Sequence, residues 1–194
     1  MRAPVSVRPA IAADLDIMLR VRFLAIVSAY TSVAYRISVC DLLGWLYQES
    51  RQAERARWVN LLISHQCQLS VAEVDGAIVG FVSAKRYSAS NLAMPHIGSL
   101  YILPEFQRQG IGTMLMHRAT TWLGRHQMIG LEVVEYNKKA IAFYETLGFG
   151  LGTQSSTLSL PSRKKIPHLR MTLPRMGASL QKSVESFVDL HRTK

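Results

Sequence analysis

The 194-residue sequence has few cysteines and no long apolar run, and these shortages exclude several classes of protein. The two cysteines, Cys40 and Cys67, are too few for a disulfide framework and lack the spacing of zinc ligands. No stretch approaches the roughly 18 continuous apolar residues that a membrane-spanning helix needs. No apolar run that could serve as a signal peptide follows Met1. We therefore expect a soluble, cytoplasmic protein with no membrane contact and no metal site.

Acidic residues are also scarce: 13 of them stand against 23 lysines and arginines, which leaves a formal net charge of +10. Much of this excess lies in residues 161–194. A basic field favours anionic partners such as nucleic acid, a polyphosphate cofactor or acidic lipid, and a solvated basic surface is the alternative explanation. The charge alone therefore allows a nucleic-acid partner, although no nucleic-acid-binding motif supports one.

The composition indicates a folded chain, because hydrophobic residues make up 48% of it and charged residues 19%. The spacing of the apolar residues predicts an α+β fold, and Asp75-Gly76 predicts a two-residue hairpin turn. Strands are expected at residues 5–8, 69–73, 78–84, 94–103, 129–135, 149–159 and 168–173. Helices are expected from Asp14 onward, within 41–64, at 110–125 and at 138–147.

One domain is expected over residues 1–173, followed by a basic C-terminal extension over 174–194. The pattern changes after Pro174, where Leu180, Val184 and Phe187 would share one face of a terminal helix. Packing of this helix against the domain is one interpretation, and contact within a homodimer is the second.

A buried strand followed by a short turn and two glycines, Gly110 and Gly112, has the form of an anion cradle. The first amides of a helix lack internal partners and point outward along the positive end of its dipole. Glycine removes side chains that would block the approach of a phosphate to the backbone. The segment is not a P-loop, because no lysine precedes Thr113, and it lacks the third small residue of a dinucleotide-binding fingerprint, where Leu115 stands.

The same segment resembles motif A of the GNAT acyltransferases, which reads Gln/Arg-x-x-Gly-x-Gly/Ala after a strand that ends in proline. Here Gln107-Arg-Gln-Gly110-Ile-Gly112 follows Leu100-Tyr-Ile-Leu-Pro104. A second segment resembles motif B of that family, with Asn137, Ala140, Phe143-Tyr144 and Gly148-Phe149 at matching spacings. The resemblance implies a GNAT-like fold, with a mixed, largely antiparallel sheet of about six to seven strands flanked by helices. It also implies a cofactor bound where two central strands splay apart.

The resemblance implies acetyl-coenzyme A (acetyl-CoA) as the acyl donor, with its pyrophosphate on the glycine turn and its pantetheine arm along the preceding strand. Arg108, Lys138 and Lys139 flank this expected site and could steer the anionic donor. The residues expected to bind it are Tyr101, Ile102, Leu103, Gln107, Arg108, Gln109, Gly110, Ile111, Gly112, Thr113, Asn137 and Tyr144.

The implied reaction is direct attack of a primary amine on the thioester in a ternary complex, which requires a proton donor and a proton acceptor. Tyr144 matches the family's proton donor to the leaving thiolate, and a packed aromatic ring is the alternative explanation. His96 stands where relatives often carry a carboxylate, and imidazole titrates near neutrality, so we predict it as the base. Glu135 and Glu73 are the rival candidates.

The acceptor is not readable from the sequence, and a small-molecule amine or a peptide N-terminus would suit the motifs. Tyr30, Tyr35 and Trp58 are candidates for the acceptor region by location only, and core packing is the better explanation for Trp58. Two other functions stay open. One is a basic protein that binds nucleic acid or the ribosome, and the other is a catalytically inactive sensor of coenzyme A.

Overall fold

The computed structural model describes residues 4–48, 50–86 and 94–175, and one seven-stranded sheet runs through them. Its strands are β1 (Val5–Pro9), β2 (Cys67–Val74), β3 (Ala77–Lys85), β4 (His96–Ile102), β5 (Ile129–Val134), β6 (Gly150–Ser159) and β7 (Lys165–Leu173). Their order is β1-β2-β3-β4-β5-β7-β6, and every neighbouring pair is antiparallel except β4 and β5. This confirms the expected α+β fold and its mixed, largely antiparallel sheet.

The helices of the described residues are α1 (Leu15–Tyr30), α2 (Val39–Leu46), α3 (Arg51–Ile63), α4 (Ile111–Leu123) and α5 (Lys138–Thr146). Residues 41–64, where helical structure was expected, contain parts of two helices because two serines cap separate starts. The Ser38 hydroxyl accepts the Asp41 amide at 3.3 Å, and the Ser50 hydroxyl accepts the Ala53 amide at 3.2 Å. The expected hairpin turn at Asp75-Gly76 is present, with both residues in the left-handed region.

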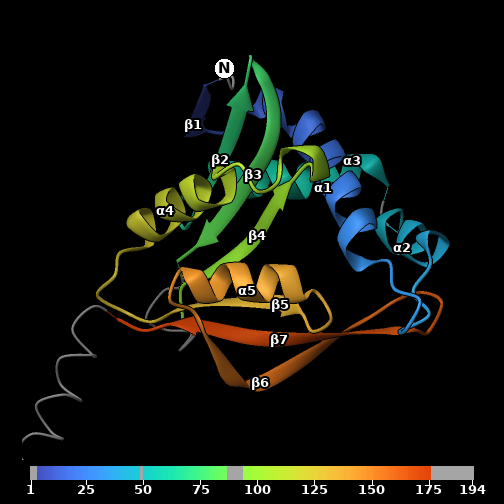
Figure 1. Cartoon of the computed structure of the whole chain (residues 1–194). Coiled ribbons are helices and arrows are strands. Elements are labelled where there is room, and N and C mark those ends of the chain that lie inside the picture. The colour runs from blue at the N-terminus through green and yellow to red at the C-terminus, as the bar shows by residue number, and fades with distance from the viewer. Residues whose placement is uncertain (1–3, 49, 87–93, 176–194) are drawn as a thin grey trace, which may run out of the picture.

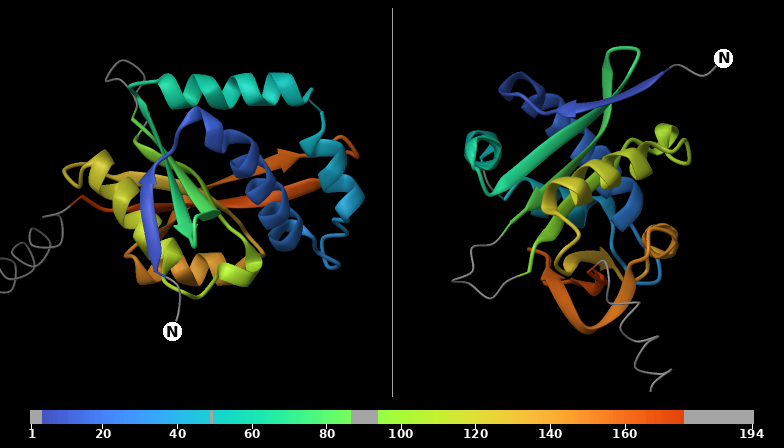
Figure 2. Two further views of the ribbon diagram at one scale, coloured as in Figure 1. Left: turned by 90° about the horizontal axis from the view of Figure 1, so that it is seen from above. Right: turned by 90° about the vertical axis from the view of Figure 1, so that its left-hand side faces the viewer.

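Helices cover both faces of the sheet (Figures 1 and 2). We call one face the α4 face, where α4 and α5 pack through a core that includes Leu115, Ile141 and Val133. We call the other the α1 face, where α1 packs on β3 and β4 and α3 packs on β2. Trp58 of α3 is buried there against Phe81, as core packing predicts.

An ion-pair network surrounds Asp14, the residue that directly precedes α1. The Asp14 carboxylate accepts the Ile11 amide at 2.8 Å and both terminal nitrogens of Arg8 at 2.7 and 2.9 Å. Arg8 also donates to Glu73 of β2 at 2.7 Å. The hydrogen bonds from Arg8 hold the pKa of Asp14 below its ordinary value. This network ties β1, α1 and β2 together and engages Glu73, one of the rival bases.

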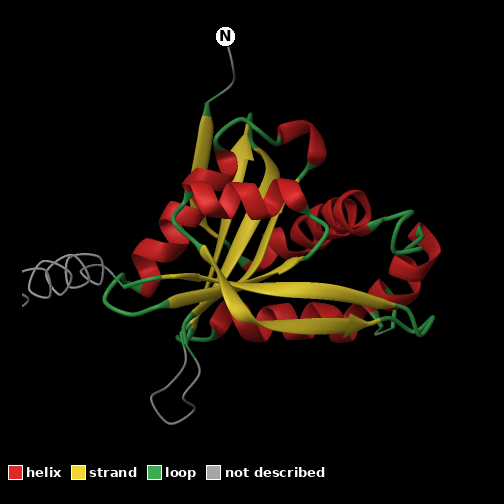
Figure 3. Ribbon diagram, turned by 60° about the horizontal axis from the view of Figure 1, so that its bottom comes forward, coloured by secondary structure: helices red, strands yellow, loops and turns green. Residues whose placement is uncertain are grey.

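β4 and β5 separate soon after they meet, and Figures 1 and 3 show the two sets of strands diverging. Only His96–Gly130 and Ile97–Leu131 pair across this junction. The register of β4 against β3 then shifts between Ile97 and Ser99, which places a β-bulge at Gly98. Side chains along a strand alternate between the two faces of the sheet, and the bulge shifts this alternation by one residue. Ile97, Leu100 and Ile102 therefore all contact the core of the α4 face. We call the gap between β4 and β5 beyond this bulge the split.

The β6–β7 hairpin is fastened to the connection between α1 and α2. Lys164, in the hairpin turn, donates to the carbonyl of Arg36 at 2.8 Å and to the Asp41 carboxylate at 2.7 Å. The Tyr136 hydroxyl donates to the carbonyl of Tyr30 at 2.6 Å and so fixes the end of α1. These contacts hold α1 and α2 on the α1 face, over the C-terminal end of β5 and the N-terminal end of β7.

Three expectations from the sequence concern membrane-spanning helices, metal sites and the C-terminal extension. In the part of the chain that the structure describes, no helix is long and apolar enough to cross a membrane. Within the same residues no three His, Cys, Asp or Glu side chains are grouped so as to hold a metal ion. The expected terminal helix of the extension 174–194 lies outside the described residues, which end at Arg175.

Candidate functional site

The glycine turn exposes unpaired backbone amides at the start of α4. Gly110 is the N-cap of α4 with a φ of 82°, a conformation that glycine adopts without steric cost. The first amide to bond back within the helix is that of Met114, which donates to the Gly110 carbonyl at 3.1 Å. The amides of Ile111, Gly112 and Thr113 therefore have no intrahelical partner, and the first turn holds no acidic residue. Such an end is suited to an anion.

Gly112 serves close packing as well as backbone access. A Cβ at this position would lie 3.0 Å from Cζ of Phe143 and 3.3 Å from Cδ1 of Ile102. The missing side chain therefore makes room for α5 and β4, a role that the sequence analysis did not anticipate. This contact brings α5, which carries Tyr144, against the start of α4.

The open edge of β4 presents backbone groups to the split. The Leu103 amide donates to the Val79 carbonyl of β3 at 2.9 Å. Because neighbouring peptide groups on a strand point to opposite sides, those of Leu100 and Ile102 face the split. The side chain of Gln107 donates to the Ile102 carbonyl at 3.2 Å, so this predicted donor-site residue caps the edge of the strand.

The other predicted donor-site residues lie around this turn or on α5. Arg108 takes a φ of 61° and is exposed, and the Gln109 side chain donates to the Glu105 carbonyl at 3.0 Å. Asn137 is the N-cap of α5, and its side-chain oxygen accepts the Ala140 amide at 3.2 Å. Lys138 and Lys139 are exposed in the first turn of α5.

Tyr144 is buried on the inner side of α5, between the rings of Phe143 at 5.3 Å and Phe149 at 6.0 Å. Burial, and then the nearby hydroxyl of Tyr101, raises the pKa of Tyr144 well above its ordinary value. The phenol therefore stays protonated throughout the neutral range. Burial, followed by the nearby hydroxyl of Tyr101, likewise raises the pKa of Tyr30. Tyr30 and Tyr101 pack against the same core cluster.

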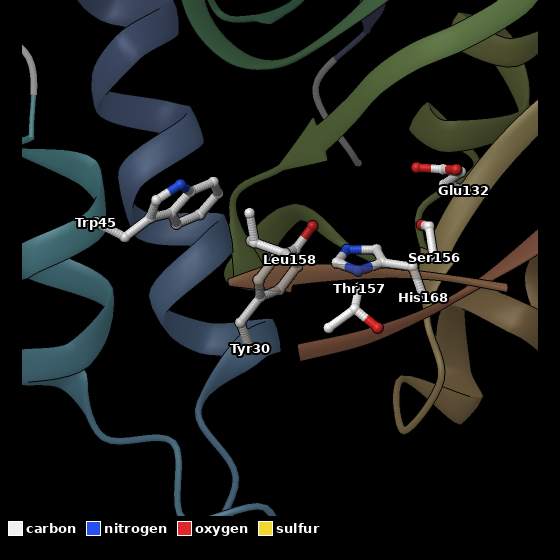
Figure 4. A pocket seen from close by; sticks show the side chains of 7 residues that line it. All are labelled: Tyr30, Trp45, Glu132, Ser156, Thr157, Leu158 and His168. Atoms are coloured by element: carbon white, nitrogen blue, oxygen red, sulfur yellow. The ribbon is translucent and has the colours of Figure 1, made fainter. Parts of the chain in front are cut away.

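A cavity of about 380 Å³ opens beside Tyr30 on the α1 face (Figure 4). Tyr30 and Trp45 form its helical wall, with ring centroids 6.4 Å apart and planes nearly parallel. Glu132 and His168 lie on the strand side. The lining residues are Tyr30, Trp45, Glu132, Ser156, Thr157, Leu158 and His168. The cavity and the α4 turn thus lie on opposite faces of the sheet.

Neither His96, the base predicted from the sequence, nor its rival Glu135 lines this cavity. His96 starts β4, opposite Gly130, at the closed end of the split. Burial, followed by the charge of Lys85, lowers the pKa of His96, and Glu132 partly opposes that shift. Glu135 follows β5, where its amide donates to the Pro167 carbonyl at 2.9 Å.

Sequence reasoning missed Glu132, Trp45 and His168 as cavity residues. Glu132 carried a signal, because it is the one charged residue in the otherwise apolar strand β5. His168 and Trp45 carried none, because only the fold brings β7 and α2 together. Tyr30 was a candidate by location and does line the cavity, whereas Tyr35 packs on Tyr136 with ring centroids 4.6 Å apart.

A comparison of the sequence with protein families shows which family the chain belongs to. The model of the acetyltransferase (GNAT) family matches residues 32–149, which include the glycine turn, β4, β5 and all of α5. The chain belongs to the acetyltransferase (GNAT) family. This confirms the assignment made from the two motifs.

Curated members of the GNAT family resemble part of the chain. An N-alpha-acetyltransferase of Sulfurisphaera tokodaii is 33% identical over 103 residues, which are 47% of this chain and 62% of that protein. The peptidyl-lysine N-acetyltransferase YiaC of Escherichia coli is 34% identical over 79 residues, which are 41% and 47% of the two chains. The alignments thus span less than two thirds of these relatives.

Solved structures show the GNAT fold over a larger part of the chain. The PaiA N-acetyltransferase of Thermoplasma acidophilum, in complex with coenzyme A, superposes with a TM-score of 0.70. The match covers 88% of this chain and 99% of that chain at 18% sequence identity. At this identity the likeness establishes the fold and not the substrate.

Proposed function

We propose that this protein transfers an acetyl group from acetyl-CoA to a primary amine. The observation that carries the proposal is the split between β4 and β5, with an anion-binding helix start on the α4 face and a cavity on the α1 face. Tyr144 is buried in the core of the α4 face and keeps its proton at neutral pH. Two substrates could therefore approach the same point from opposite faces, as direct transfer requires.

The donor side is suited to coenzyme A by its backbone and its charge. The unpaired amides of Ile111, Gly112 and Thr113 would hold the pyrophosphate, and exposed Arg108 adds positive charge. The peptide groups of Leu100 and Ile102 would pair with the amide-bearing pantetheine arm in place of a neighbouring strand. Bound there, acetyl-CoA would supply an activated acetyl thioester.

Tyr144 acts as the proton donor in this proposal. Its hydroxyl gives a proton to the sulfur of the departing thiol, and the rings of Phe143 and Phe149 hold the phenol in place. A buried phenol with a raised pKa is suited to this role, because it stays protonated until a stronger acceptor forms beside it.

An acceptor amine with a pKa of about 10 is mostly charged at neutral pH, so it must give up a proton before or during attack. His96 and Glu135 remain the predictions from the sequence for this step. A base must reach the amine directly or through one water. From where these two residues lie, outside the cavity lining, they would need such a relay.

The acceptor would be a small amine or the N-terminus of a peptide that enters the cavity. A cavity of about 380 Å³ is near the lower end of the range for small-ligand sites, so it suits one side chain or one terminal residue. The relatives' names point the same way, to α-amino groups and to lysine side chains.

Calorimetric binding of acetyl-CoA to the wild type and to Gly110→Glu tests the donor site. The substitution strains the turn and places a negative charge at the helix start, so we expect affinity to fall by roughly 100-fold. Gly44→Glu is the matched control, because Gly44 lies exposed on α2 with open space around it. Equal affinities in all three proteins, or no binding by a folded wild type, would refute the donor site.

Thiol release from acetyl-CoA then identifies the acceptor class. The probes are an unblocked hexapeptide, an N-acetylated hexapeptide with one lysine, and phenylethylamine as a small amine. We expect at least one of them to accept the acetyl group, with the product confirmed by a mass increase. Tight binding of acetyl-CoA without transfer to any amine would favour the sensor over the enzyme.

A further inference from the structure

His168 lies at the centre of the cavity's strand wall. It stands on β7 directly opposite Ser156 of β6 and Val134 of β5. Its ring meets the ring of Tyr30 edge-on, with centroids 6.2 Å apart and planes at 71°. Figure 4 shows the imidazole directed from the strand toward Tyr30. The imidazole therefore faces the space that the acceptor would fill, beside the phenols of the split.

One hydrogen bond fixes which nitrogen of His168 carries the proton. Nδ1 lies 3.0 Å from the carbonyl oxygen of Ile166, which is two residues away on the same strand. A carbonyl oxygen only accepts hydrogen bonds, so Nδ1 must be the donor. In the neutral ring the lone pair is then on Nε2, the nitrogen on the other side of the ring. A backbone-fixed tautomer of this kind orients an imidazole as a proton acceptor.

We propose that Nε2 of His168 takes the proton from the acceptor amine, which makes His168 a catalytic base of the proposed acetyl transfer and rests on that function. The N–H bond of the ammonium group breaks and a bond from Nε2 to that proton forms. The electron pair left on the amine nitrogen forms the new bond to the acetyl carbon. The carbon–sulfur bond breaks with its pair on sulfur, which receives the proton of Tyr144. The new amide nitrogen then releases its second amine proton to solvent, and the Tyr144 phenolate takes a proton back from solvent, so the one net proton of the reaction stays on His168 until it too passes to solvent.

The charged and titratable groups that face His168 support this role. From β5, Glu132 lines the same cavity and can stabilise both a cationic acceptor and the imidazolium that forms. Arg170, two residues along β7, lies 3.9 Å from Glu132 and so limits the negative charge there. From α1, Tyr30 keeps its proton, because burial raises its pKa. β6 and α2 contribute Ser156, Thr157, Leu158 and Trp45, which carry no charge.

The location of His168 distinguishes it from the base predicted from the sequence. His96 is separated from Tyr101 by five positions of β4, which is about 16 Å along a strand. His168 instead lines the cavity and packs edge-on against Tyr30, which shares a core cluster with Tyr101. An amine in the cavity would therefore be within direct reach of His168, whereas His96 does not line the cavity.

Nitrogen-15 NMR of the histidine rings tests the tautomer without any acceptor. Long-range proton–nitrogen spectra of the full-length protein at pH 8 should show His168 as the Nδ1–H tautomer, assigned among the six histidines by its absence in His168→Asn. A His168 ring with its proton on Nε2 would overturn the proposal, whatever the protein acetylates.

Kinetics with the best probe of the acceptor screen test the chemistry. His168→Asn keeps a donor where Nδ1 stands, and His168→Gln keeps a polar group near Nε2, but neither can take up a proton. We expect kcat/KM for the amine to fall by about 100-fold or more in both, with KM for acetyl-CoA within about twofold. The fall of kcat/KM toward acid pH should weaken in both variants, because imidazole no longer titrates.

Two other histidine variants make the result specific. His117→Asn, on the exposed side of α4, should behave as the wild type. His96→Gln should keep the acid limb of the wild-type profile if His168 is the base, and should lose it if His96 is. Failure of the wild type to acetylate any amine would count against the proposed function. An active wild type with unaltered His168 variants would count against His168 alone.

Discussion

The two halves of the sheet differ in how they are joined and covered. β1 to β4 pair along most of their lengths and lie between α4 on one side and α1 with α3 on the other. β5, β7 and β6 pair with one another, and among the described residues their strand pairing with the first half is limited to His96–Gly130 and Ile97–Leu131. The first half is a continuous scaffold, and we call the second half the wing.

This difference shows why the proposed chemistry belongs at the junction. A fully paired strand has no backbone groups left for a ligand, whereas β4 beyond its bulge has an open edge. The same opening lets Tyr144 from the α4 face approach Tyr30 and Tyr101 from the α1 face. Changes at the junction should therefore have larger effects than changes in the wing.

Tyr144→Phe should give the largest effect, because it removes one hydroxyl from the junction and leaves the packed ring in place. We expect kcat to fall by roughly 100-fold or more, with KM for acetyl-CoA nearly unchanged. The raised pKa of Tyr144 also predicts that the wild-type rate shows no loss of its donor up to pH 10. Tyr47→Phe, on an exposed tyrosine, is the control. A variant with wild-type kcat would remove Tyr144 from the mechanism.

Binding of acetyl-CoA should slow amide hydrogen exchange on one side of β4 and not on the other, an effect smaller than the fall of kcat in Tyr144→Phe. On addition of acetyl-CoA, the amides of Leu100 and Ile102, which face the split, should exchange about tenfold more slowly. The amides of Tyr101 and Leu103 face β3, and their exchange should change little. Mass spectrometry with single-residue fragmentation, or NMR, measures each amide. Equal slowing of all four amides would mean that acetyl-CoA does not pair with the edge of β4.

Lys164→Met should have the smallest effect, because it loosens the wing far from the donor. Without its bonds to Asp41 and the Arg36 carbonyl, the cavity wall is less well held. We expect KM for the amine to rise roughly two- to fivefold, while KM for acetyl-CoA stays constant. Lys165→Met, at the exposed neighbouring position, is the matched control. A rise in both KM values would point to a general loss of structure.

The direction in which the pKa of Asp41 shifts predicts how the ion pair between Lys164 and Asp41 depends on pH. Hydrogen bonds from Lys164, and then from Ser38, hold the pKa of Asp41 well below its ordinary value. A carboxylate with a lowered pKa in the folded state contributes its stability above its unfolded pKa and loses it as pH falls through the folded value. The ratio of KM values for variant and wild type should therefore be constant between pH 5 and 9.

Local patterns predicted the scaffold well, because its elements carry strong local signals. The alternation around Asp75-Gly76 predicted the hairpin, and the string from Leu100 to Gly112 predicted the strand, the turn and the helix start. Family membership followed from the same residues. These features depend on spacing within about 15 residues, which a single sequence displays.

The cavity could not be predicted, because it depends on contacts between distant parts of the chain. Tyr30 and His168 are far apart in sequence and meet only after β7 pairs with β5. The bulge at Gly98 was also missed, since a glycine within a strand does not reveal whether it adds a residue. The motif predicts His96 as the base, but the sequence alone does not show how far along β4 His96 lies from the phenols.

The bulge at Gly98 makes the length of β4 matter more than its composition. The extra residue sets which side chains after it face each side of the sheet: Leu100 and Ile102 pack on the α4 face, and Tyr101 packs on the α1 face. A deletion or insertion at this point would exchange the two sets and turn the phenol of Tyr101 to the α4 face. Many apolar residues would be tolerated along this strand, but a change of one residue in its count would not.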